Sequence, residues 1–117
     1  MEIPQFHQID TKEKVASLWL SNQNRPQLLF KHSFRCGISA GALYGLEPFL
    51  KEIQAMVDLH FIDVVAYREF SLAIANEFKV MHQSPQVIIW QNQKIIYQAS
   101  HSAIRGDVIL QKLRMVL

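Results

Sequence analysis

Short apolar runs alternate along the chain with segments whose apolar residues recur every three or four positions. The runs are typical of buried strands, and the longer spacing is typical of helices with one buried face. Strands are predicted over 6–9, 27–31, within 57–65, 86–90 and 94–98, and helices over 11–21, 36–53, 69–78 and 104–116. The predicted order of elements is therefore βαβαβαββα, which indicates an α/β domain.

The connections between these strands predict how the strands pair. Helices that join the early strands act as crossover connections, and crossovers join parallel strands. The last two strands are separated by residues 91–93 alone, which predicts an antiparallel hairpin. A central mixed sheet with helices on both faces satisfies both conditions, and the thioredoxin fold has the same element order. We therefore expect a single thioredoxin-like domain over residues 1–117.

Three local features refine the predicted helices. Asp10, with Glu13 three residues later, resembles a capping box and predicts the start of the first helix. Pro48 lies inside the apolar pattern of the second helix and should kink it. Gly106 should weaken the first turn of the last helix slightly.

Composition and charge exclude several classes of function. The 117 residues carry a formal net charge of +2 and contain no basic run, so nucleic acid is not an expected partner. No apolar stretch approaches the ~20 residues that span a bilayer, so no membrane partner is expected either. Residues 1–10 lack the pattern of a signal peptide, which predicts a cytoplasmic protein. The histidines and the single cysteine do not follow metal-ligand spacings, so we predict no metal site and no tightly bound cofactor.

The candidate reactive group is Cys36, the single cysteine of the chain. It stands where the strand over 27–31 has ended and the second helix begins. The free N–H groups at a helix start favour a thiolate, which is the nucleophilic form of cysteine. We therefore interpret Cys36 as a reactive thiol rather than an inert cysteine at a helix start.

The neighbours of Cys36 in the sequence support this interpretation. Lys31, Arg35 and His32 add positive charge, and Gly37 leaves the sulfur open to a substrate. Ser39 can direct its hydroxyl or its backbone N–H to the sulfur, at the position where a CxxC protein has its second cysteine. Without that second cysteine, any redox cycle must use an external thiol.

Ser84 and Pro85, just before the strand over 86–90, form the second informative feature. Together with Cys36 they predict a cis peptide bond, which would present backbone groups beside the nucleophile to an extended substrate. His82 can line the same site or be an ordinary loop histidine. For three further residues we favour plain structural roles over catalysis: His60 in a strand, Asp63 at a strand end, and His101 as a cap or an exposed side chain.

Three blocks of the sequence resemble one family. The segments FKHSFRCGIS (30–39), HQSPQ (82–86) and ASHSAI (99–104) are similar, in this order and spacing, to the YtxJ-like monothiol bacilliredoxins. The resemblance implies a thioredoxin fold and a cytoplasmic enzyme that removes bacillithiol from S-bacillithiolated client proteins. It matches Cys36 to the reactive cysteine of the family and Ser84 and Pro85 to the segment beside it. The co-substrate would be bacillithiol or another low-molecular-weight thiol.

Two departures from the family pattern keep alternatives open. Gly37 stands where well-known members have proline, and Arg35 stands where they have a small hydroxyl residue. The C-G-I-S motif also approaches the C-G-F-S of monothiol glutaredoxins, although the Gly-Gly pair of glutaredoxins is missing after the final hairpin. The alternatives are an iron–sulfur cluster carrier of the monothiol-glutaredoxin kind and an inert thioredoxin-like binding domain.

Overall fold

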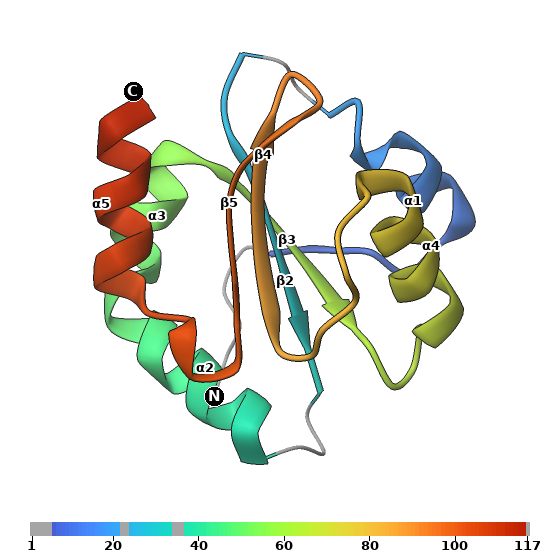
Figure 1. Ribbon diagram of the computed structural model, residues 1–117, viewed down its shortest axis with the longest axis horizontal. Coiled ribbons are helices and arrows are strands. Elements are labelled where there is room, and N and C mark those ends of the chain that lie inside the picture. Colours follow the sequence, from blue (N-terminus) through green and yellow to red (C-terminus); the bar gives the residue numbers. More distant parts are fainter. Residues whose placement is uncertain (1–5, 22–23, 34–36, 117) are drawn as a thin grey trace.

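The computed structural model describes residues 6–21, 24–33 and 37–116, and for residues 37–39 the backbone alone (Figure 1). Its strands are β1 (His7–Gln8), β2 (Gln27–His32), β3 (Asp58–Asp63), β4 (Gln86–Gln91) and β5 (Lys94–Ser100). Its α-helices are α1 (Lys12–Leu18), α2 (Gly37–Leu46), α3 (Leu50–Met56), α4 (Arg68–Phe78) and α5 (Gly106–Val116). Two 3₁₀-helices, η1 (Glu47–Phe49) and η2 (His101–Ala103), complete the described elements.

The strands form one mixed sheet in the order β1-β3-β2-β4-β5. Strands β1 and β2 both run parallel to β3, while β4 runs antiparallel to β2 and to β5. The prediction of a mixed sheet with a C-terminal hairpin is confirmed. The hairpin turn consists of Asn92 and Gln93, whose φ angles of 54° and 58° suit the two-residue turns that match the twist of paired strands.

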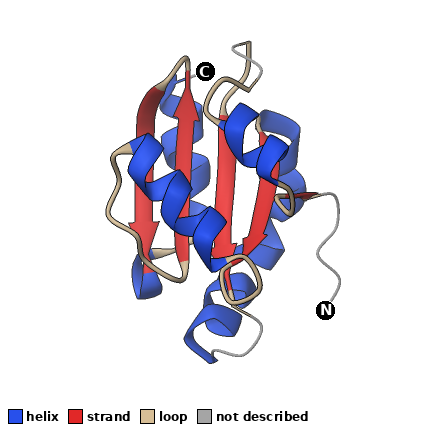
Figure 2. Ribbon diagram, turned by 90° about the vertical axis from the view of Figure 1, so that its right-hand side faces the viewer, coloured by secondary structure: helices blue, strands red, loops and turns tan. Residues whose placement is uncertain are grey.

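Helices cover both faces of the sheet, as the sequence predicts. Helices α2, α3 and α5 lie on one face, and α1 and α4 lie on the other (Figures 1 and 2). All six residues of β2 are buried, so this strand is covered on both faces of the sheet. Leu28 and Phe30 point into the core under α2, α3 and α5, and Leu29 points into the core under α1 and α4.

The start of α1 corrects one expectation. The N-cap is Thr11, whose hydroxyl accepts a hydrogen bond from the Lys14 backbone N–H at 3.2 Å, and not Asp10. Asp10 instead forms an ion pair with the Lys14 side chain at 2.8 Å. Both residues can cap a helix, so sequence alone does not separate two neighbouring candidates.

The predicted second helix is divided at Pro48, as the missing backbone donor of proline demands. Helix α2 ends at Leu46, the 3₁₀-helix η1 contains Pro48, and α3 resumes at Leu50. The break allows Phe49 to pack beside Gly106, the first residue of α5. A Cβ atom on Gly106 would lie 2.7 Å from Cγ of Phe49, so the glycine is needed for close packing.

Candidate functional site

The candidate site lies at the edge of the sheet where β2 ends and β4 begins. Lys31 pairs with Gln86 in the antiparallel register of β2 and β4, so the chain leaving β2 and the loop entering β4 meet at this edge. Helix α2 begins at Gly37, which confirms a helix start directly after Cys36 in the sequence. Cys36 and Arg35 themselves lie outside the described residues, as does the side chain of Ser39.

The Pro85 loop, which comprises residues 79–85 between α4 and β4, is fixed to its surroundings by several hydrogen bonds. The Ser84–Pro85 peptide bond is cis, as predicted. The Pro85 carbonyl accepts a hydrogen bond from the His101 N–H at 3.1 Å. The buried Gln86 side chain donates to the Met81 carbonyl at 3.1 Å and accepts from the Gln83 N–H at 3.3 Å.

Ser84 lies between these fixed points. Its backbone makes no hydrogen bond within the described part of the chain. The N–H and C=O of Ser84 can therefore pair with an extended substrate, as strand-edge groups do in peptide recognition.

His32 is the last residue of β2, which extends one residue beyond the strand predicted over 27–31. Its side chain is buried, and its ring stacks on Phe30 with 5.2 Å between centroids and lies 5.8 Å from the ring of Phe61. It packs in the core under α2, α3 and α5. The predicted contribution of its charge to the Cys36 site stays a prediction.

Lys31 points to the opposite face of the sheet and is completely buried. Its ammonium nitrogen lies 3.2 Å from Nδ1 of His82, in the connection between α4 and β4. Burial lowers the pKa of Lys31 to about 8, because the charged form loses its hydration. The pKa of His82 is also lowered, first by burial and then by the positive charges of Lys31 and Arg68.

Sequence reasoning treated Lys31 only as a source of positive charge near Cys36 and missed its contact with His82. The sequence nevertheless contained a signal that Lys31 is buried. Leu28, Leu29 and Phe30 are all apolar, so the next residue of a strand that is covered on both faces is also expected to be buried.

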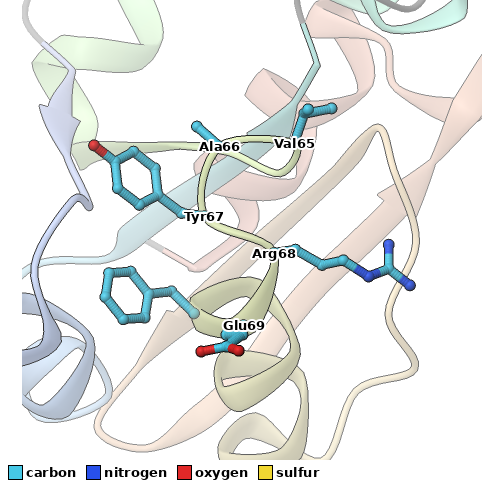
Figure 3. A pocket seen from close by; sticks show the side chains of 6 residues that line it. Val65, Ala66, Tyr67, Arg68 and Glu69 are labelled. Carbon is cyan, nitrogen blue, oxygen red and sulfur yellow. The ribbon is translucent and has the colours of Figure 1, made fainter.

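Arg68 is the first residue of α4 and completes this group of basic side chains. It also lines a pocket of about 230 Å³ at the turn between β3 and α4, together with residues 65–67, 69 and 70 (Figure 3). In this view Arg68 extends away from Tyr67 toward the connection between α4 and β4. The rings of Tyr67 and Phe70 lie parallel, 5.7 Å apart, on the other side.

The remaining candidates have the structural roles that we favoured. Asp63 ends β3 and accepts hydrogen bonds from the Val65 and Ala66 N–H groups, at 3.0 and 3.2 Å. His101 is exposed and begins η2, and it does not cap α5. His60 is buried in β3, where its Nε2 lies 2.7 Å from the Gln27 side-chain oxygen, and burial lowers its pKa to about 4.

The described residues contain neither a cluster of metal-ligating side chains nor a helix that could span a membrane. No group of three or more histidine, cysteine, aspartate or glutamate side chains there is placed to hold a metal ion. No helix in the described ranges has both the length and the apolar character needed to cross a bilayer.

Solved structures of thioredoxins align with nearly the whole chain. The thioredoxin of Trypanosoma brucei brucei is 17% identical over 98% of this chain and 93% of its own, with a TM-score of 0.72. The thioredoxin of Fasciola hepatica is 17% identical over 94% of this chain and 98% of its own, with a TM-score of 0.69. The chain therefore has a thioredoxin-like fold.

The family follows from two further similarities. A candidate oxidoreductase with a thioredoxin fold is 25% identical over 92% of this chain and 93% of its own, with a TM-score of 0.77. The family model of the monothiol bacilliredoxin BrxC matches residues 7–109, a range that includes Cys36 and Pro85. The chain belongs to the monothiol bacilliredoxin family, and its family and fold support a thiol-oxidoreductase role.

Proposed function

We propose that this protein is a cytoplasmic monothiol disulfide reductase that removes bacillithiol from S-bacillithiolated client proteins through Cys36. The observation that carries the proposal is the start of α2 at Gly37, directly after the one cysteine of the chain. The N–H groups of a helix start stabilise a thiolate. The match of the bacilliredoxin model across Cys36 and Pro85 supports bacillithiol as the small thiol.

The proposed reaction has two exchange steps. The Cys36 thiolate attacks the bacillithiol sulfur of the mixed disulfide, and the client leaves as a thiolate that takes up a proton. A second bacillithiol thiolate then attacks the bacillithiol sulfur of the mixed disulfide on Cys36. This step releases bacillithiol disulfide and returns Cys36 to its thiolate form. One free bacillithiol is consumed in the cycle: the mixed disulfide is exchanged for bacillithiol disulfide, and the client cysteine is released as a free thiol.

The backbone of Ser84 is proposed to hold the client segment during the first step. Its N–H and C=O make no hydrogen bond within the described ranges, at the edge where β4 begins. A substrate strand paired there would lie beside the segment that leaves β2. Gln86 supports this arrangement because its side chain holds the loop from Met81 to Gln83.

Intact-mass spectrometry tests the proposal directly. The reduced protein is mixed with a bacillithiolated client, and the masses of both proteins are followed with time. The expected result is addition of one bacillithiol to this protein and loss of the same mass from the client, and free bacillithiol added afterwards should remove the adduct. The Cys36→Ser variant should show neither change. An unmodified wild-type protein beside an unchanged client would contradict the proposal.

The pH dependence of Cys36 alkylation provides a second test. An activated thiolate reacts with iodoacetamide at a rate that levels off below the usual thiol pKa of about 8.5. A rate that keeps rising up to that pH would indicate an inert cysteine and favour the binding-domain alternative. Visible absorption bands after anaerobic reconstitution with iron and sulfide would favour the cluster-carrier alternative.

A further inference from the structure

Three basic side chains from three different segments gather beside the Pro85 loop. They are Lys31 in β2, Arg68 at the start of α4, and His82 in the connection that leads to Pro85. Lys31 Nζ and His82 Nδ1 are 3.2 Å apart. Arg68 extends toward the same connection (Figure 3), and its positive charge helps to lower the pKa of His82.

No acidic side chain compensates this group within the described residues. The ion pairs there involve Lys14, Arg25, Arg105 and Arg114 and include neither Lys31 nor Arg68. Lys31 is completely buried, and the one hydrogen bond of its side chain in the described part of the chain is with His82. Cations placed together without a counterion attract an anion.

The Lys31–His82 hydrogen bond determines which groups face such an anion. An ammonium group can only donate, so Nδ1 of the neutral His82 ring must accept and the ring proton must lie on Nε2. Within the described ranges, Nε2 makes no hydrogen bond. The Nε2–H of His82 and the guanidinium of Arg68 are therefore two available donors, and a carboxylate accepts from two donors.

We propose that Arg68 and His82 bind a carboxylate of the low-molecular-weight thiol that reacts at Cys36. Lys31 is a positioning residue that fixes the tautomer of His82. This inference rests on the proposed function and adds a feature of the substrate: the small thiol must carry a free carboxylate. A neutral small thiol of the same size is a poorer co-substrate.

A binding experiment tests the site independently of thiol chemistry. The Cys36→Ser protein is titrated with 3,3′-thiodipropionate, a dicarboxylate thioether that cannot exchange disulfides, and amide shifts are followed by NMR. The expected result is saturable shifts at Arg68 and around His82, weakened about tenfold or more in Arg68→Gln because a charge-assisted hydrogen bond is lost. The absence of saturable shifts at these residues overturns the proposal.

Arg114→Gln is the matched control, because it removes the same charge from α5, where Arg114 pairs with Glu52 on the surface. This variant should bind the dicarboxylate like the parent protein. Equal weakening in Arg114→Gln and Arg68→Gln would mean that net charge alone attracts the ligand. That result would overturn the proposal of a defined site.

A kinetic experiment connects the site to the reaction. The reduced protein is mixed with 3,3′-dithiodipropionate or with the neutral bis(2-hydroxyethyl) disulfide, and formation of the Cys36 adduct is timed by mass spectrometry. Arg68→Gln should slow the reaction with the dicarboxylate about tenfold and leave the neutral reagent unchanged. Equal slowing with both reagents overturns the assigned role. If neither reagent modifies the wild-type protein, the proposed function fails, and the titration still decides whether the anion site exists.

The role of Lys31 has its own spectroscopic readout. Ring nitrogen-15 shifts of His82 distinguish the Nε2–H from the Nδ1–H tautomer. The wild-type ring should be almost entirely Nε2–H, and Lys31→Met should allow both tautomers and weaken dicarboxylate binding. An unchanged tautomer in a folded Lys31→Met protein would refute the positioning role.

Discussion

Replacing Lys31 by methionine removes a buried ammonium group and keeps a flexible side chain of similar length. Lys31 is completely buried, and burial lowers its pKa from 10.5 to about 8. The difference of about 2.5 units corresponds to about 3 kcal/mol by which the folded state disfavours the charged form. The variant also loses the hydrogen bond to His82, worth about 1 kcal/mol. Lys31→Met should therefore raise the free energy of unfolding at pH 7 by about 2 kcal/mol.

The pH dependence of this gain follows from the direction of the shift. Between pH 8 and 10.5 the unfolded chain binds the Lys31 proton more tightly than the folded protein does. The wild-type protein therefore becomes more stable relative to the variant as the pH rises through this window. The advantage of Lys31→Met should be complete below pH 8 and vanish between pH 8 and 10.5; above this window the variant should be less stable by about 1 kcal/mol, the lost hydrogen bond to His82.

Urea unfolding followed by tryptophan fluorescence at a series of pH values measures the effect. Lys51→Met is the control, because Lys51 is exposed on α3, and its substitution should change stability by less than about 0.5 kcal/mol. A destabilised Lys31→Met protein at pH 7, or a difference that does not vary with pH, would refute the idea of a desolvated cation at this position.

Four further substitutions test the fold. Gly106→Ala should reduce the free energy of unfolding by about 1–3 kcal/mol, because its Cβ would overlap the Phe49 ring; Gly41→Ala, with no atom within 4 Å of its Cβ, should raise it by up to about 1 kcal/mol. Urea midpoints compare the two, and equal effects would exclude the proposed overlap. Folding holds the pKa of His60 near 4, so the wild-type protein should lose about 3 kcal/mol more than His60→Gln as the pH falls from 6.5 to 4; parallel stability curves would contradict a buried neutral histidine. Gln93→Gly should raise the thermal midpoint, because the left-handed conformation costs glutamine about 1 kcal/mol more than glycine. A lower midpoint would count against this interpretation of the turn.

The elements of the fold could be predicted because their apolar periods are clear. The run from Leu28 to Phe30 identified β2, and the three- and four-residue spacing identified the helix that follows. Pro48 also predicted the interruption of that helix correctly, because the loss of a backbone donor acts locally. These signals depend on single segments and need no knowledge of tertiary contacts.

What the sequence did not reveal depends on contacts between distant segments. Gly106 was interpreted as a weak helix residue, and its true neighbour, Phe49, lies more than fifty positions earlier in the chain. The contact between Lys31 and His82 likewise joins β2 to the loop before β4. Pattern analysis predicts that such residues are buried, but not which residues they meet.

The buried cation connects the stability of the fold with the proposed chemistry. A fully buried lysine without an ion pair in the described residues destabilises the folded state, and methionine would fill the same space without that penalty. Positions that reduce stability in this way are concentrated at functional sites. If Lys31→Met stabilises the protein and also weakens dicarboxylate binding, Lys31 serves recognition at the expense of stability. If the same substitution stabilises the protein and leaves binding and the His82 tautomer unchanged, the anion site must be formed without Lys31.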